Sequence, residues 1–387
     1  MKKLFTILAV IIYFITYYDT TAQTYNGAFY EMFFGSEPSA RAEGMGRHLS
    51  AITGDPLSYY YNPAGMASVQ GLSLNAGFAG PYYTKFDYKL DDSRYNYFGA
   101  FYNVKKYGTA GLSMDYFTFG YDEEIVITDE FGNVTGTEKY DPDITNYRLT
   151  LSSEVIKDLF VGVNFNLLHP DFDTPEYTVG NEKMGNDKDV FYFDLGVIKS
   201  FNFDSKKLNQ DVNLGMSIIN AFSAEYSDAD DDYSGKLPVI FRFGASYNLS
   251  LNDMSIIPKL KSYNFLIDGE YEDLFNSKYY GGFHAGFEFT FLEILALRAG
   301  FYSQENVYRL FNYDTTGAYL SVTETENSIS EFTYGFGLNI PIKQLTGGKT
   351  PIDIKFDYAN LNQPAYKEDK DSPGKFHVYT IIFNWIF

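Results

Sequence analysis

Few residues in this chain could carry out acid–base or metal chemistry. The sequence has 0 Cys and 4 His, and none of the histidines lies in an HExxH or similarly spaced ligand motif. They are His48, His169, His284 and His377. His284 and Glu288 would share one face of a strand and could form a dyad, but a solvated pair on a polar face explains the spacing more simply. The sequence therefore predicts a protein that is not an enzyme and holds no cofactor.

One acidic stretch, YSDADDDYSG at 226–235, resembles a calcium-binding loop. Asp228, Asp230 and Asp232 alternate as the first ligands of such a loop do. Tyr233 occupies the sixth position, where the tight turn requires glycine, and no glutamate occupies the twelfth. We therefore expect a solvated loop here and no metal site.

The start of the chain and its composition indicate an exported protein. Two lysines precede an apolar run at residues 4–18, and Thr20 and Ala22 fit a small-x-small cleavage rule, so we expect residues 1–22 to be a signal peptide. An exported chain without cysteine cannot be stabilised by disulfides. The formal net charge of −20 excludes nucleic acid as a partner. No later apolar run reaches the roughly 18 residues of a membrane-spanning helix.

Apolar residues alternate along the rest of the chain with the period of a β-strand. In FVGVNFNLLH, Val163 and Phe165 lie on one face and Asn164 and Asn166 on the other. The second face of such segments also carries charged groups, namely Arg148, Glu154, Asp194, Arg242, Asp268, Glu270, His284, Glu288, Arg298 and Asp353. We count about 14 segments of about ten residues, the length that crosses a bilayer when tilted.

This pattern predicts an all-β fold, a transmembrane antiparallel β-barrel of about 14 strands over residues 70–387. A secreted protein of several β-sandwiches is the alternative, because alternation alone does not tell lipid from a protein core. An even strand count closes the sheet and leaves no edge in hydrocarbon.

The links between segments alternate in length. Short links include KKYG at 105–108 and IKD at 156–158. The long polar links are 120–143, 169–189, 222–237, 304–329 and 361–374. Short turns at one end and long external loops at the other are typical of outer-membrane barrels. We therefore expect the cell outer membrane of a Gram-negative bacterium as the location.

The last segment, HVYTIIFNWIF, shows the alternation most clearly. Its bulky face carries Tyr379, Phe383, Trp385 and Phe387. We expect this strand to close the barrel against the first strand, with the bulky face in outer-membrane lipid. The same four residues resemble the C-terminal signal that the bacterial barrel-assembly machinery reads, which makes that machinery an expected partner.

Residues 23–69 precede the first strand and have a different pattern. Gly44 and Gly46 allow close backbone approach, and in NPAGMA Asn62 is a candidate helix cap with Pro63 at the first helical position. A lumen bounded by about 14 strands is too wide for side chains alone to fill. We therefore expect residues 23–69 to form a plug in the lumen, with a periplasmic arm as the alternative. Arg41 and Arg47 could pair with inward carboxylates such as Asp194, Asp268, Glu288 or Asp353.

This segment carries a resemblance to a known family. ARAEGMG, a following aspartate and YYYNPAGMA are similar to the N-terminal signature of the PorV/PorQ family of outer-membrane proteins. The matching residues are Ala40, Arg41, Ala42, Gly44, Met45, Gly46, Asp55, Asn62, Pro63, Ala64 and Gly65. Arg47 and His48 depart from the family pattern, which usually has a small or apolar residue after the second glycine. The family is related to the long-chain fatty-acid transporter barrels, so the resemblance implies 14 strands and an N-terminal segment in the lumen.

The resemblance implies two functions, and the sequence leaves both open. The first is the handling or docking of secreted proteins for the type IX secretion system, with secretion-system proteins and secreted cargo as partners. The long acidic loops would then be the contact surface. The alternative is a channel for uptake of hydrophobic solutes such as long-chain fatty acids, which requires an apolar pocket in the lumen and a plug that moves. The polar inward face slightly favours the first.

Overall fold

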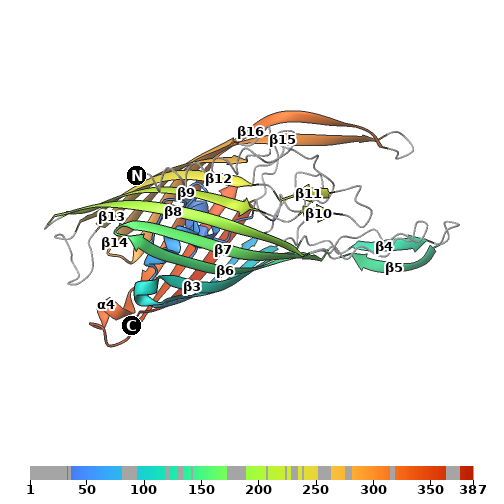
Figure 1. Ribbon diagram of the computed structural model, residues 1–387. Helices are drawn as coiled ribbons and strands as arrows, with labels where there is room; N and C mark the ends of the chain where they lie inside the picture. The colour runs from blue at the N-terminus through green and yellow to red at the C-terminus, as the bar shows by residue number, and fades with distance from the viewer. Residues whose placement is uncertain are drawn as a thin grey trace.

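A computed structural model gives the fold of the 387-residue chain (Figure 1). It describes Phe33 and residues 36–80, 94–118, 123–128, 134–140, 143–171, 189–205, 208–222, 225–227, 234–237, 239–251, 263–274, 281–313, 319–362 and 375–386. The expected signal peptide, most of the acidic stretch at 226–235 and Phe387 lie outside these residues.

The alternating segments form the strands of one closed barrel. Its strands are β1 (Leu72–Gly80), β2 (Arg94–Asn103), β3 (Thr109–Thr118), β6 (Asp143–Ile156), β7 (Leu159–Asp171), β8 (Val190–Asp204), β9 (Leu208–Ala221), β12 (Ile240–Leu251), β13 (Tyr263–Leu274), β14 (Gly281–Phe291), β15 (Leu295–Tyr313), β16 (Tyr319–Ile340), β17 (Ile352–Asn362) and β18 (Lys375–Trp385). Neighbours in this order pair antiparallel, and β18 pairs with β1, placing Leu74 opposite Phe383. The predicted 14-strand barrel and its closure by the last strand are confirmed.

The alternation sorts side chains between the outer surface and the lumen. On β18, Phe383 and Trp385 are 47% and 48% exposed, whereas Thr380 and Ile382 are buried. Similar exposed apolar residues recur around the barrel, among them Leu74, Phe98, Leu112, Leu149, Phe165, Phe191, Phe243, Ile267, Phe283, Leu297 and Phe336. A closed antiparallel barrel with this outer surface satisfies its backbone groups in hydrocarbon, and the protein lies in the outer membrane.

Short helices lie before and between the strands. They are α3 (Ala40–Gly44), η1 (Ser58–Tyr60) and η2 (Pro63–Ser68) ahead of β1, η3 (Lys105–Tyr107) after β2, and α4 (Ile342–Leu345) after β16. Within the described residues, no helix has the length and apolar character needed to cross a membrane.

The two ends of the barrel differ. The connections at 104–108, 157–158, 292–294 and 341–351 lie together at one end, which we call the short-turn end. At the opposite end, the hairpin end, paired strands extend beyond the barrel (Figure 1). β15 and β16 stay paired out to Tyr313 and Tyr319, although β15 pairs with β14 only as far as Gln304.

The hairpin end also corrects part of the loop prediction. β4 (Glu123–Thr128) pairs with β5 (Val134–Tyr140), and β10 (Glu225–Ser227) pairs with β11 (Ser234–Lys236). The loop expected at 304–329 is wrong outside residues 314–318, because β15 and β16 continue through the rest of it. A strand length set by the bilayer underestimates strands that leave it, and this stretch contains the β-branched and aromatic residues that favour pairing.

Candidate functional site: the plugged lumen

Residues 36–69, which we call the plug, lie inside the barrel and are almost entirely buried. Ser39 caps α3 by accepting a hydrogen bond from the Ala42 backbone N–H. Asn62 caps η2 in the same way through Ala64, with Pro63 at the first position, as its sequence predicts. α3 contacts β15 to β18, and η2 contacts β6, β7 and β8, so the plug reaches across the lumen from one wall to the opposite wall.

Glycines in the wall make room for the plug backbone. A Cβ at Gly300 would overlap the backbone of Gly46, and a Cβ at Gly215 would overlap the carbonyl oxygen of Ser50. Gly46 has a φ of +90°, which other residues rarely adopt. Wall glycines of this kind face the plug from many strands, namely Gly77, Gly162, Gly196, Gly215, Gly244, Gly286, Gly300 and Gly335. The plug is thus fitted to this wall at backbone level.

Arg41 joins the plug to the wall through a row of alternating charges. Its guanidinium donates to both oxygens of Glu288 on β14, at 2.7 and 3.0 Å, and to Asp55 of the plug at 2.9 Å. Glu288 also accepts from Nε of Arg298 at 2.6 Å, and Arg298 lies 2.7 Å from Asp357 on β17. Bidentate charged bonds of this kind are short and strong. Of the expected pairings, that of Arg41 with Glu288 is confirmed, whereas Arg47 pairs with Glu37 and Glu43 of the plug itself.

Arg47 and His48 make a second set of polar contacts. Arg47 has a left-handed φ of 71°, and its guanidinium lies 3.3 Å from Glu43 within the plug. Nε2 of His48 lies 3.2 Å from a carboxylate oxygen of Asp268 on β13. Burial lowers the pKa of His48, but Asp268 and Glu270 outweigh it and raise the pKa to about 9. His48 is therefore charged at pH 7 and attracted to the wall.

Glu43 lies on the same side of the plug and is fully buried. Burial raises the pKa of Glu43 to about 8, although Arg47 opposes the shift. The carboxyl group is therefore mostly neutral at pH 7, which lets it sit in the interior at low cost.

His284 and Glu288 share the inward face of β14, but they are neither a dyad nor solvated. Both are buried. Nδ1 of His284 lies 2.7 Å from the carbonyl oxygen of Gly46, and Glu288 is bonded to Arg41 and Arg298. The expectation of a solvated pair is wrong because the plug fills the space that water would occupy. Both residues hold the plug.

The wall from β2 to β8 is apolar at the hairpin end. The strand register sets Tyr95, Phe117 and Ile144 side by side, and all three are fully buried. Leu168 and Val190 adjoin each other on β7 and β8, again buried. Barrel interiors in the outer membrane are usually polar. These inward rows make the hairpin end of the lumen an apolar core, packed together with plug residues such as Tyr59.

Three plug tyrosines lie between this apolar wall and the charged one. Tyr59 stacks on Phe101 with ring centroids 5.2 Å apart, and the guanidinium of Arg148 lies 4.8 Å above the Tyr59 ring. The Tyr61 hydroxyl donates to Glu37 at 2.9 Å. Burial raises the pKa of Tyr60 and keeps it neutral. The YYY motif therefore fills the centre of the lumen and separates its two halves.

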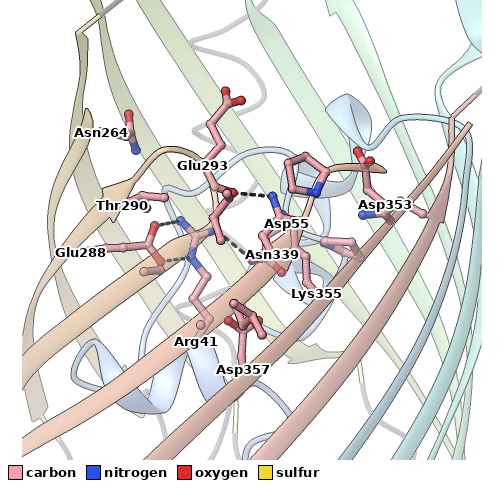
Figure 2. Close-up of a pocket in the computed structure, with 18 of the residues that line it drawn as sticks. Arg41, Asp55, Asn264, Glu288, Thr290, Glu293, Asn339, Asp353, Lys355 and Asp357 are labelled. Atoms are coloured by element: carbon pink, nitrogen blue, oxygen red, sulfur yellow. Dashed lines mark hydrogen bonds and ion pairs between the residues drawn. The ribbon is translucent and has the colours of Figure 1, made fainter. Parts of the chain in front are cut away.

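The short-turn end of the lumen holds a polar cavity of about 450 Å³ (Figure 2). Figure 2 shows Arg41 and Asp55 of the plug facing the wall residues of this cavity, which include Asn264, Glu288, Thr290, Glu293, Asn339, Asp353, Lys355 and Asp357. A second cavity of about 260 Å³ shares Arg41 and Asn264 with it. We call the two cavities the vestibule. Arg41 borders both, so the plug forms the inner limit of the vestibule.

The residues of the family signature all lie in the plug, and all but the half-buried Arg41 are buried. Their contacts hold the plug backbone in place. Asn62, for example, donates to the carbonyl oxygen of Ser50 at 2.7 Å and to that of Val197 on the wall at 3.2 Å. Among the described residues, no three His, Asp or Glu side chains are placed to hold a metal ion.

Sequence reasoning missed the apolar inward rows. Tyr95, Tyr97 and Phe98 put bulky residues on both faces of β2, and Ile144 opens β6 where the long link was expected to end. Apolar residues on both faces near a strand end are the signal that could have revealed them.

Neither the scan against family models nor the search of curated protein sequences finds a match for this chain. The chain is similar to several solved barrels. The toluene transporter TodX of Pseudomonas putida aligns with a TM-score of 0.43 at 10% identity, covering 91% of this chain and 99% of that one. The monoaromatic hydrocarbon channel CymD aligns with a TM-score of 0.42 at 12% identity, covering 91% and 98%. A FadL homologue of Pseudomonas aeruginosa aligns with a TM-score of 0.41 at 11% identity, covering 90% and 98%.

Proposed function

We propose that the protein is a plugged outer-membrane transporter that takes up hydrophobic solutes such as long-chain fatty acids. The observation that carries this proposal is the division of the lumen. It is apolar at the hairpin end, closed by the plug in the middle, and polar and hollow at the short-turn end.

The apolar lining supports the class of solute. Tyr95, Phe117 and Ile144 form a fully buried apolar cluster with Phe33 and the plug residue Tyr59, at the end where long loops face the exterior in outer-membrane barrels. A solute would reach this surface when the plug shifts. A hydrophobic solute gains free energy by leaving water for such a surface, at roughly 25 cal/mol per Å² buried. A polar solute would gain nothing there.

The contacts of the plug support control of passage. Apart from its continuity with β1, the plug is held by ion pairs, hydrogen bonds and packing. A carboxylate or a carbonyl oxygen accepts the main bonds from Arg41 and Asn62. Such contacts can be exchanged for contacts with water or a solute. The vestibule supplies space on the short-turn side into which plug residues could shift.

The test is uptake of labelled oleate by cells that contain the wild-type protein or one of two serine variants. Ile144→Ser and Phe117→Ser place a hydroxyl on the apolar lining, and we expect each to lower oleate uptake several-fold. Leu112→Ser on the outward face of β3 is the matched control and should retain uptake. Heat-modifiable mobility verifies that each barrel is assembled. Equal uptake by all four assembled proteins would rule out the proposed lining.

Deleting residues 26–60 tests the role of the plug separately. An assembled barrel without these residues should show a higher single-channel conductance in planar bilayers. Unchanged conductance would mean that the plug does not limit passage.

A second function, docking of secreted proteins for the type IX secretion system, is favoured by the hairpin end. The distal parts of β15 and β16, together with the β4–β5 and β10–β11 pairs, form two-stranded ribbons outside the barrel sheet. Ribbon edges can pair with an extended segment of a partner. Shortening β15–β16 by deleting residues 306–327 should abolish co-purification of secreted cargo and leave oleate uptake intact. Loss of uptake with retained cargo would favour the transporter alone.

A further inference from the structure

The short-turn end carries lysines on three separate connections. Lys105 and Lys106 lie between β2 and β3, and Lys157 lies between β6 and β7. Lys343 and Lys349 lie between β16 and β17. All are exposed except the half-buried Lys343. We call these five residues the lysine rim.

The lysine rim has no carboxylate partners of its own within the described part of the chain, where the ion pairs are made by arginines and histidines. Two acidic groups beside Lys157 are engaged within their turn, and Asp353 accepts from the backbone N–H of Lys343 at 3.1 Å. Glu154 accepts from the Asp158 backbone N–H at 2.7 Å, and Asp158 accepts from Asn202 at 3.1 Å. The ammonium groups are therefore available to an external anion.

Apolar side chains beside these lysines indicate how deep the lysines lie in the membrane. Tyr107 is 70% exposed and Ile156 is 64% exposed, and each adjoins a lysine of the rim. Leu345, which is 50% exposed, lies two residues from Lys343. Nζ of Lys106 lies 5.0 Å from the centre of the Tyr107 ring. Exposed aliphatic and tyrosine side chains at a strand end mark the boundary of the hydrocarbon, so the ammonium groups lie at headgroup level.

The charge of the rim does not follow from composition. The formal net charge of the chain is −20, and residues 120–143 alone contain 8 acidic residues and 1 basic residue. The rim lysines thus lie opposite this acidic stretch, at the end that faces the periplasm in outer-membrane barrels. The phospholipid leaflet of the membrane lies at that end.

We propose that the lysine rim binds the phosphate groups of anionic phospholipids in the periplasmic leaflet. An acidic protein would be recognised by lysines gathered on one patch. The rim instead spreads its lysines over three connections, each bordered by side chains that face lipid. Phosphate at headgroup level is the anion that all five can reach.

The test uses the full mature protein reconstituted in nanodiscs of phosphatidylcholine with and without phosphatidylglycerol. Native mass spectrometry counts retained phosphatidylglycerol, and heat-modifiable mobility gives the unfolding midpoint. We expect phosphatidylglycerol to be retained and to raise the midpoint. In a variant with Lys105→Gln, Lys106→Gln, Lys343→Gln and Lys349→Gln, apparent affinity should fall by roughly fivefold per lysine removed, as expected for about 1 kcal/mol each.

Lys139→Gln on β5, at the hairpin end, removes one positive charge, as each rim substitution does, and should retain wild-type affinity. Equal retention of phosphatidylglycerol by the wild-type protein and the four-lysine variant would overturn the proposal. A roughly fivefold loss in Lys139→Gln, equal to the loss per rim lysine, would also overturn it, because the effect would then follow net charge and not position. If the rim binds polyglutamate in detergent and shows no preference for phosphatidylglycerol, the proposal is wrong. The partner of the rim would then be an acidic protein.

Discussion

At the residue scale, Arg41 is the contact that most directly ties the plug to the wall. Replacing Arg41 with methionine removes the shared partner of Glu288 and Asp55. Because Arg41 is half-buried and Glu288 keeps Arg298, we expect the cost to stay below the about 3–5 kcal/mol of a fully buried pair. We expect the Arg41→Met plug to loosen and the conductance of the assembled barrel to rise. Planar-bilayer recording measures this.

A double variant serves as its control. Adding Glu288→Gln removes the carboxylate that Arg41 would have paired, so Arg41→Met with Glu288→Gln should be less destabilised than the sum of the two single changes. Strict additivity of the unfolding free energies would mean that the two residues do not act as a pair.

His48 makes the seating of the plug depend on pH. Its pKa is raised from 6.5 to about 9 in the folded protein, so the contribution of the charged imidazole is complete below pH 6.5 and is lost as pH rises through 9. The loss amounts to at most about 1.4 kcal/mol per pH unit over that window. The unfolding midpoint of the wild-type protein should therefore fall between pH 7 and pH 9.5.

The His48→Gln variant tests the assignment. It cannot titrate, so its midpoint should vary less with pH over the same window. Glu43, whose pKa is about 8, adds a loss of the same sign in both proteins, because its neutral form is the one that burial favours. Identical pH profiles for the two proteins would exclude His48 as the source.

At the element scale, β18 offers a direct test of which face meets lipid. Phe383 points outward and Asn384 lines the vestibule. A charge at the bilayer midplane costs roughly 2–4 kcal/mol in such barrels. Phe383→Arg should therefore reduce the amount of assembled barrel much more than Asn384→Arg, as scored by heat-modifiable mobility. A comparable loss of assembled barrel in both variants would contradict this assignment of the two faces.

The wall glycines give a second test at this scale. In Gly300→Val the new side chain would overlap the Gly46 backbone, so we expect the plug to be displaced and the barrel to be destabilised. Gly269→Ala is a matched control, because a Cβ there meets only the carbonyl oxygen of His284, at an ordinary 3.5 Å. Protease digestion of the purified barrels should release plug fragments from Gly300→Val and none from Gly269→Ala.

The elements show which features the sequence predicts well. Period-two alternation located all the barrel strands, because lipid and lumen impose opposite polarity on neighbouring residues such as Phe383 and Asn384. The cap formed by Asn62 and Pro63 could also be predicted, because it depends only on neighbouring residues. The ribbon of β15 and β16 was missed because it leaves the bilayer, where no such contrast acts. The ion pairs of the plug depend on the barrel register, which brings Glu288, Arg298 and Asp357 together from three strands.

At the scale of the whole molecule, the two ends predict a topology that can be measured in cells. Single cysteines can be introduced into a background with 0 Cys. Gly136→Cys lies on β5 at the hairpin end, with no atom within 4 Å of its new side chain, and Tyr107→Cys lies on the exposed β2–β3 turn. An impermeant maleimide should label the first in intact cells and the second only after lysis. Labelling in the reverse order would invert the orientation.

The seam between β1 and β18 also constrains the order in which the plug and the barrel assemble. The plug touches both sides of this seam, since Ala40 donates to Thr380 on β18 and Gly77 of β1 packs against Pro38. The ring is complete only when these two strands meet, and the plug, which precedes β1 in the chain, is then enclosed by thirteen other strands. A plug that arrived late would have to thread a finished cylinder. The plug is therefore enclosed in the same step in which β18 pairs with β1. The surface on which β18 docks is partly made of the plug itself.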